Sequence, residues 1–256
     1  MKKLLLGYLL VIITACQSAT STPTPADSLF PTSTPLPTLL PFDQTQGEPD
    51  TPTPQPTPTF EPSPTALPRF FIQEFNDSIA GWVILQAGND SVPSVNVANG
   101  SLLLQIDSAF TWLYALYGPE DYADVRIETQ YQNLAGAPAS AGLVCRYSET
   151  DGWLEFNLSA DGLYNILYGK WLALGVAEYT PITDGLIKDA QPSGASQSIG
   201  LECSGDTLTL LVNENILRRV DVSRFELGAG KVGVTAASYE NSPVVTGFEL
   251  VEVGEP

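Results

Sequence analysis

The sequence contains no histidine. Histidine is the side chain that most often acts as a general base near neutral pH, and it is also the commonest ligand of transition metals. Its absence excludes a Ser-His-Asp triad and a Cys-His nucleophile. Soft metal ligands are scarce too, because the 256 residues include only three cysteines and one methionine. We therefore expect no zinc site.

Basic side chains are also few. The chain carries 11 lysines and arginines against 29 aspartates and glutamates, which gives a formal net charge of −18. A chain this acidic repels nucleic acid and anionic lipid headgroups. We expect no nucleic-acid partner, and any membrane attachment has to work without a basic patch.

The first apolar run, residues 4–13, is too short to span a bilayer as a permanent helix. Lys2 and Lys3 precede it and small residues follow it, which is the order found in a secretory signal peptide. The next residues, Ile13-Thr14-Ala15-Cys16, resemble the bacterial lipobox. At a lipobox, a signal peptidase cuts before the cysteine, and the thiol and the new amine then carry lipid.

This resemblance implies that residues 1–15 are a lipoprotein signal peptide and that Cys16 is lipidated by acyl chains such as palmitate. The protein would then be anchored to the cell membrane and face the extracytoplasmic side. Each buried methylene contributes about 0.8 kcal/mol, so several acyl chains on one residue anchor a protein stably. Loss of Lys2 and Lys3 would change the net charge from −18 to −20. The alternative is an ordinary secreted protein cut near Ala15.

Residues 16–68 are dominated by proline, threonine and serine. Fourteen of the 21 prolines lie between Gln17 and Pro68, so neither helix nor sheet can propagate there. Proline and another residue alternate throughout residues 51–58. We expect residues 16–68 to be a disordered, semi-rigid tether that reaches at most about 160 Å at ~3.1 Å per residue.

Residues 69–256 form the predicted globular domain, and their apolar residues alternate with a period of two. Turn signals recur between the alternating runs, as at Asn99-Gly100 and Asp161-Gly162. This pattern predicts an all-β sandwich, with a single helical turn near residues 222–225. The clearest predicted strands are residues 101–106, 124–129, 153–158, 163–168, 207–212 and 231–236.

Several segments of this domain occur in an order that matches a known fold. They are GLVCRY at 142–147, DGWLEF at 151–156, ADGLY at 160–164, IGLECSGDTLTLLVN at 199–213 and GKVGV at 230–234. Together they resemble the concanavalin A-like lectin/glucanase jelly roll, in its laminin-G-like and keto-disaccharide-hydrolase-like branch. The resemblance covers residues 70–253 and implies a jelly-roll β-sandwich. The usual Asn-Gly turn after the leucine-rich strand is replaced here by Asn213-Glu214-Asn215.

The two remaining cysteines are Cys145 and Cys203, because lipidation would take Cys16 out of the count. Outside the cytoplasm, two such thiols are usually paired. Each follows a Gly-Leu pair at the start of its segment, and the fold is expected to bring the two segments close together. We predict a disulfide between them, and two free thiols are the alternative.

Aromatic and polar side chains gather in two neighbouring predicted strands. Alternation places Trp153, Glu155 and Asn157 on one face, and the two tyrosines of the next strand also share a face. Aromatic rings stack on the apolar faces of sugars, while amides and carboxylates bind hydroxyl groups. The alternative is that the rings serve packing. The predicted ligand-binding residues are Trp153, Glu155, Asn157, Tyr164, Tyr168 and Trp171.

Glycosidases need two carboxylates that face each other across a cleft. Related glucanases place theirs on one strand, and no Glu-x-Asp-x-x-Glu motif occurs in this chain. Glu155 is the best single acidic candidate, and the alternative is an exposed or ion-paired residue. We therefore predict a non-catalytic module that binds a polysaccharide or surface glycan. A glycan-acting hydrolase and a protein-adhesion or structural module remain alternatives.

Calcium is common in the family that the sequence resembles, and hard cations prefer several oxygen ligands. The resemblance implies that the first and last strands pair. This pairing would bring together the acidic and amide side chains near the two ends of the domain, which predicts a structural calcium site. The alternative is a turn capped by Asp77. The predicted ligands are Glu74, Asn76, Asp77 and Glu249.

Overall fold

The computed structural model describes residues 68–76, 78–89, 91–134, 139–187 and 195–256. The predicted signal peptide, Cys16 and all but the last residue of the predicted tether lie outside these residues. In the described part of the chain, no helix is long and apolar enough to cross a membrane.

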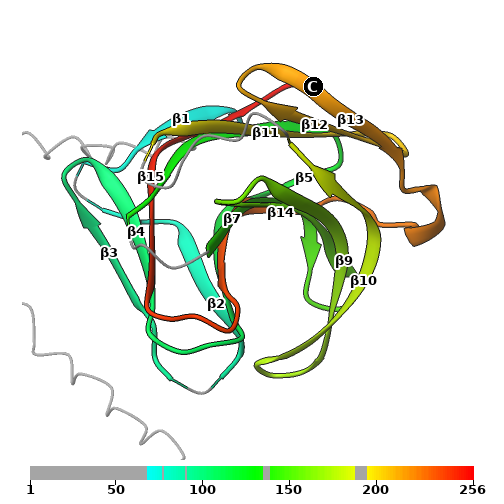
Figure 1. The fold of residues 1–256 in the computed structure, drawn as a ribbon. Helices are drawn as coiled ribbons and strands as arrows, with labels where there is room; N and C mark the ends of the chain where they lie inside the picture. Colours follow the sequence, from blue (N-terminus) through cyan, green and yellow to red (C-terminus); the bar gives the residue numbers. More distant parts are fainter. Residues whose placement is uncertain (1–67, 77, 90, 135–138, 188–194) are drawn as a thin grey trace, which may run out of the picture. The chain divides into compact units, whose positions relative to one another are not determined.

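Two antiparallel sheets form a sandwich (Figure 1). One sheet has eight strands. Seven of them follow one another in a single order, and the eighth, β1 (Phe71–Glu74), pairs separately with β15 (Val244–Gly254). That order is β13 (Asn215–Asp221), β12 (Thr207–Val212), β11 (Gln197–Ser204), β6 (Val125–Asn133), β15 (Val244–Gly254), β4 (Ser101–Ile106), β3 (Ser94–Ala98). The other sheet has seven strands in the order β10 (Val176–Leu186), β9 (Leu163–Ala173), β8 (Gly152–Ser159), β7 (Ala139–Ser148), β14 (Gly230–Ser238), β5 (Thr111–Tyr122), β2 (Trp82–Gly88).

Local alternation accounts for the strands where it was clearest. The predicted strands at 101–106 and 207–212 coincide with β4 and β12. The predicted helical turn is a 3₁₀ turn over Ser223–Phe225. The hairpin between β3 and β4 has φ of 54° at Asn99 and 75° at Gly100, as a two-residue turn requires. The hairpin between β12 and β13 has positive φ at Asn213 and Glu214, so it turns without glycine.

The two sheets enclose one hydrophobic core, and a disulfide crosses it. Cys145 of β7 and Cys203 of β11 are bonded, their Cα atoms are 6.7 Å apart, and both side chains are fully buried. The bond therefore joins the seven-stranded sheet to the eight-stranded sheet. The predicted pairing of these cysteines is confirmed.

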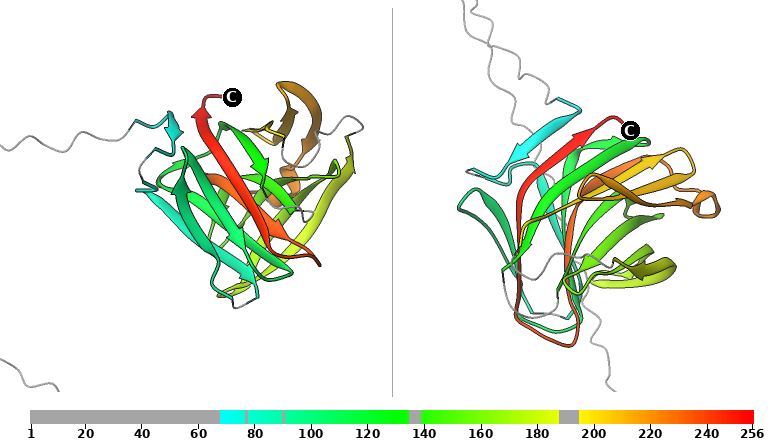
Figure 2. Two further views of the ribbon diagram at one scale, coloured as in Figure 1. Left: turned by 60° about the vertical axis from the view of Figure 1, so that its left-hand side comes forward. Right: turned by 45° about the horizontal axis from the view of Figure 1, so that its top comes forward.

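The first strand lies beside the last one, as the jelly-roll topology implies. Phe71 of β1 pairs with Val253 of β15, and Glu74 pairs with Leu250 (Figure 2). The ring of Phe71 packs on Tyr117 with centroids 4.3 Å apart. Both ends of the domain are thus held on the eight-stranded sheet.

The seven-stranded sheet is buried on both faces. Its convex face contributes to the main core, and its inner face carries a second apolar cluster that includes Tyr114, Val144 and Trp153. Figure 1 shows the sheet as an arch in which the hairpin between β9 and β10 turns in toward β2. The hairpin therefore covers part of the inner face.

Candidate functional site

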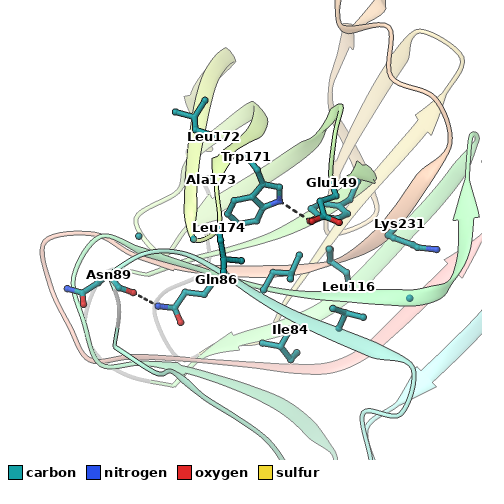
Figure 3. A pocket seen from close by; sticks show the side chains of 16 residues that line it. Ile84, Gln86, Asn89, Leu116, Glu149, Trp171, Leu172, Ala173, Leu174 and Lys231 are labelled. Atoms are coloured by element: carbon teal, nitrogen blue, oxygen red, sulfur yellow. Dashed lines mark hydrogen bonds between the residues drawn. The ribbon is translucent and has the colours of Figure 1, made fainter. Parts of the chain in front are cut away.

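A cleft of about 840 Å³ opens on the inner face of the seven-stranded sheet. Residues 83–86 of β2 and Leu116 of β5 line one side, and Trp171 and residues 172–175 of the β9–β10 hairpin line the other. Figure 3 shows Trp171 on one side of this space and strand β2 with Leu116 on the other. The volume falls within the ~300–1,000 Å³ that is usual for small-molecule sites.

An aromatic pair forms one wall of the cleft. The indole Nε1 of Trp171 donates a hydrogen bond of 2.8 Å to the hydroxyl of Tyr147, and both side chains are half-buried. Trp171 also packs against the buried Trp153, with ring centroids 5.1 Å apart. The hydrogen bond and the contact with Trp153 fix the positions of the two rings. Their exposed surface is therefore pre-arranged for a flat apolar ligand face.

Tyr147 reaches this wall because of a β-bulge. Strict alternation from Cys145, which faces the main core, would send Tyr147 into the core as well. Arg146 has φ of +52°, and the pairing of β7 with β8 and with β14 shifts register at this point. One extra residue reverses the faces that follow it. Tyr147 consequently lies on the same face as Val144, three residues earlier.

Arg146 itself is held by the opposite side of the sandwich. Its guanidinium donates to the carbonyl oxygens of Ala123 at 2.9 Å and Gly205 at 2.6 Å. It also lies 3.5 Å from the carboxylate of Asp124. These bonds fix the conformation of the bulge. Arg146 lies in the chain between Cys145, which forms the disulfide, and Tyr147, which forms part of the aromatic wall.

Polar side chains lie around the cleft. Lys231 of β14 forms a 2.8 Å ion pair with Asp121, and Glu149 lies exposed after β7. The amide of Gln86 donates to the carbonyl of Asn89 and, at 2.9 Å, to that of Ser91. Gln86 pairs in register with the core residue Leu113, so its side chain lies on the core-facing side of β2. The cleft thus combines an apolar floor with a carboxylate and an ammonium group. Of its polar and aromatic lining, the sequence indicated only Trp171, because Tyr147 and Glu149 lie at and just after the end of β7 and Lys231 lies far along the chain in β14.

The predicted face of β8 exists, but its side chains lie beneath the cleft wall. Trp153 and Glu155 are fully buried, and Asn157 is 2% exposed. The carboxylate of Glu155 accepts bonds from Trp153 Nε1 at 2.7 Å and Asn157 Nδ2 at 2.7 Å. It accepts a third bond of 3.1 Å from the hydroxyl of Tyr114, which lies 2.6 Å from the hydroxyl of Tyr179. Since Tyr114 gives its only proton to Glu155, Tyr179 is the donor in the tyrosine pair.

Burial raises the pKa of Glu155 above its ordinary value, and the three donated hydrogen bonds oppose that rise. No neighbouring carboxylate or cation in the described part of the chain contributes to the shift. Burial and the charge of Glu155 raise the pKa of both Tyr114 and Tyr179. The network therefore holds one carboxyl group in an apolar setting, and hydrogen bonds alone partner it.

The structure corrects the predicted aromatic cluster in one respect. Tyr164 and Tyr168 do share a face of β9, but that face points into the main core. Tyr164 pairs across from Leu158, and Tyr168 stacks on Phe225 with centroids 4.7 Å apart. The inner face of β9 carries Trp171 instead. Trp171 is thus the one member of the predicted set that lines the cleft.

The predicted calcium ligands are only partly brought together. The amide of Asn76 donates a 3.2 Å bond to the carboxylate of Glu74, and Glu249 precedes Leu250, the register partner of Glu74. Asp77 lies outside the described residues. Among the residues that the structure describes, no three acidic, histidine or cysteine side chains form a group that could hold a metal. A calcium site at this edge stays a prediction.

No protein-family model matches the sequence, and no curated protein matches it either. Solved structures do match. A Bacillus subtilis protein of unknown function with a galectin-like fold has a TM-score of 0.55 at 11% identity, over 72% of this chain and 94% of that one. A glycosidic hydrolase has a TM-score of 0.53 at 15% identity, over 75% of this chain and 100% of that one. A Bacillus licheniformis β-glucanase has a TM-score of 0.52 at 10% identity, over 73% and 98%.

These likenesses establish the fold. The described domain is a jelly-roll sandwich of the concanavalin A-like lectin/glucanase type, as the sequence resemblance implied. At 10–15% identity they carry no assignment of activity to this chain.

Proposed function

We propose that residues 69–256 are a non-catalytic carbohydrate-binding module that binds glycan in the cleft beside Trp171. The observation that carries the proposal is the aromatic wall of Trp171 and Tyr147, with a carboxylate and an ammonium group beside it. Sugars offer a flat apolar face and a rim of hydroxyl groups, and this arrangement is complementary to both. Two of the similar structures are named as a glycosidic hydrolase and a β-glucanase, which supports a glycan ligand.

Absence of turnover is part of the proposal. Glycoside hydrolysis uses two carboxylates about 5–10 Å apart with the scissile bond between them. Glu155 is the acidic side chain at the centre of the inner face, and it is fully buried with its oxygens bonded to three donors. A carboxyl group held in this way serves the packing of the inner face.

The proposal predicts that Trp171→Ala weakens glycan binding by roughly 1–3 kcal/mol, the contribution of one buried aromatic side chain. Affinity electrophoresis and intrinsic fluorescence with a panel of polysaccharides would measure the loss. Ile216→Ala is the matched control, because Ile216 is a half-exposed apolar residue on β13 of the other sheet. Equal binding by Trp171→Ala and the parent protein would refute the site.

The same panel separates the alternatives. Accumulation of new reducing ends that stops in Glu155→Gln would make the protein a hydrolase and Glu155 its catalytic group. Failure to bind any polysaccharide would favour the adhesion alternative, for which the exposed Leu172 and Leu174 of the hairpin offer an apolar surface.

We further propose that Cys16 is lipidated and holds the module at the extracytoplasmic side of the cell membrane. The basis is the lipobox-like stretch Ile13-Thr14-Ala15-Cys16 after a short apolar run. Cys16→Ala should move the protein from the detergent-rich phase to the aqueous phase in a detergent phase-separation assay, because acyl chains supply the whole attachment. Unchanged partitioning of Cys16→Ala would show that the anchor is something else.

A further inference from the structure

The inner face of the seven-stranded sheet is closed off at one end of the cleft. Strands β2 and β10 are the two edges of this sheet. The backbone N–H of Gly88, at the end of β2, donates a 3.0 Å hydrogen bond to the carbonyl of Gly175, in the β9–β10 hairpin. Both glycines line the cleft. A backbone hydrogen bond therefore joins the edge strand β2 to the hairpin that precedes β10, the opposite edge strand.

Aromatic side chains fill the space next to this bond. Trp112 of β5 pairs in register with Ala87, the residue before Gly88. The ring of Trp112 stacks on Tyr179 of β10 with centroids 5.2 Å apart, and its edge meets Tyr239 at 6.3 Å. Tyr179 is bonded in turn to Tyr114. The stacked pair and its hydrogen bonds occupy the inner face where a longer groove would continue.

The backbone of Gly88 accepts no side chain at this closure. Its φ is +105°, and an added Cβ would lie 2.2 Å from the carbonyl oxygen of Phe110. Only glycine fits this conformation and this close approach. The closure is thus part of the local backbone, and a change of side-chain rotamer would not open it.

An extended polysaccharide that crosses a sheet needs a groove open at both ends, and this cleft has one end closed. Resting on the proposed glycan-binding function, we propose that the cleft binds the terminus of a glycan chain, or a short free saccharide, and not the interior of a long chain. Trp171 and Tyr147 supply the stacking wall for the terminal sugars. Glu149 and Lys231 lie where hydroxyl groups of the terminal units would reach them.

The test counts binding sites per gram of polymer by titration calorimetry. The full chain is purified in a detergent without a sugar headgroup, and a mixed-linkage β-glucan, a xylan and a fructan are each tested at two chain lengths. Binding to termini predicts that halving the mean chain length doubles the sites per gram. A short oligosaccharide of the bound polymer should displace that polymer completely, with an affinity equal to that of each polymer site.

Two variants locate the measured binding. Trp171→Ala should lower the affinity about tenfold or more, as loss of one stacked ring implies. Glu149→Gln changes an exposed side chain without risk to folding, and it should also weaken binding, while Ile216→Ala should not. Unchanged affinity in Trp171→Ala would overturn the proposal, because the binding would then lie outside the cleft.

The outcomes separate the two proposals. Sites per gram that stay constant as chains are shortened, or affinity that keeps rising with oligosaccharide length, would overturn binding to termini and leave glycan binding intact. If none of the three polymers or their oligosaccharides bind, the proposed function fails, and the inference drawn from it fails as well.

Discussion

Replacing Cys145 and Cys203 together by alanine should lower the free energy of unfolding by about 4 kcal/mol. The bond closes a span of 58 residues, and a cross-link of that span removes much of the conformational freedom of the unfolded chain. It also joins the two sheets across the main core, so its loss removes a tie that no backbone ladder replaces. Urea unfolding followed by fluorescence would give the difference.

Cys16→Ser is the matched control for this double substitution. It removes a sulfur atom from the chain without touching the core, so the free energy of unfolding should stay that of the parent. Thiol titration of the unreduced, unfolded parent protein adds an independent check. Two reactive thiols assigned to Cys145 and Cys203 would contradict the bond, as would a double variant with unchanged stability.

The second large effect is expected at Glu155. Glu155→Leu leaves Trp153 Nε1 and one hydrogen of Asn157 without an acceptor in the interior, while the hydroxyl of Tyr114 can turn to donate to Tyr179. Each unpartnered buried donor costs about 1–3 kcal/mol, and removal of an isolated buried charge offsets part of the sum. We expect a net loss of about 3 kcal/mol in the free energy of unfolding.

Glu155→Gln should behave differently. Its amide oxygen can still accept from Trp153 and Tyr114, and its NH₂ group can donate to Asn157 once that amide turns. The oxygen Oδ1 of Asn157 has no partner in the present orientation, so the turn gives up only the 3.2 Å bond from Nδ2 of Asn157 to Oδ1 of Asn165. This variant should therefore stay close to the parent protein in stability at neutral pH.

The pH dependence of stability distinguishes the carboxyl group from the amide. Because burial raises the folded-state pKa of Glu155 above the ordinary 4.5, the folded protein binds more protons than the unfolded chain between those two values. The contribution of Glu155 is thus most favourable at low pH and declines as pH rises through this window. The free energy of unfolding of the parent minus that of Glu155→Gln should decrease as the pH rises from 4, and it should then become constant. A difference that rises with pH, or stays flat, would contradict the shift.

Local patterns predicted six of the fifteen strands in the described residues, and two of the turns. Alternation in residues 101–106 and 207–212 matches β4 and β12, because each strand buries one face against the main core. The turn signals Asn99-Gly100 and Asp161-Gly162 work for the same reason, since the backbone conformation of a tight turn is decided within a few residues. The disulfide could be predicted because two cysteines remain besides Cys16, because thiols outside the cytoplasm are usually paired, and because the resembled fold brings their segments together.

The buried state of Glu155 could not be read from alternation. The pattern in β8 identifies which face turns away from the core, and Glu155 does lie on that face. Whether that face meets water depends on Trp171 and Tyr179, which arrive there only because the β9–β10 hairpin curls across the sheet. Glu155 is consequently neither exposed nor, within the described residues, ion-paired. Curvature on this scale is a property of the whole sheet.

One position was misjudged and another was missed for reasons of register. The hairpin between β8 and β9 pairs Leu158 with Tyr164, so Tyr164 faces the core as Leu158 does. At Arg146, an inserted residue places Tyr147 on the cleft wall, although strict alternation from Cys145 would place it on the core face. Bulges of this kind leave little trace in composition, because the residue that adopts positive φ here is arginine and not glycine.

The pairing of β1 with β15 has a mechanical consequence. Any force that arrives along the chain from residue 68 enters the domain through β1, which is held by four residue pairs with β15, by the ring of Phe71 on Tyr117 and by a 2.6 Å bond from Tyr122 to the carbonyl of Arg69. The cleft lies on the other sheet, and its disulfide tie to the eight-stranded sheet runs through β11, not β1. Under load along the chain, we expect β1 to detach first and to lengthen the connection, while the other sheet and its cleft keep their shape.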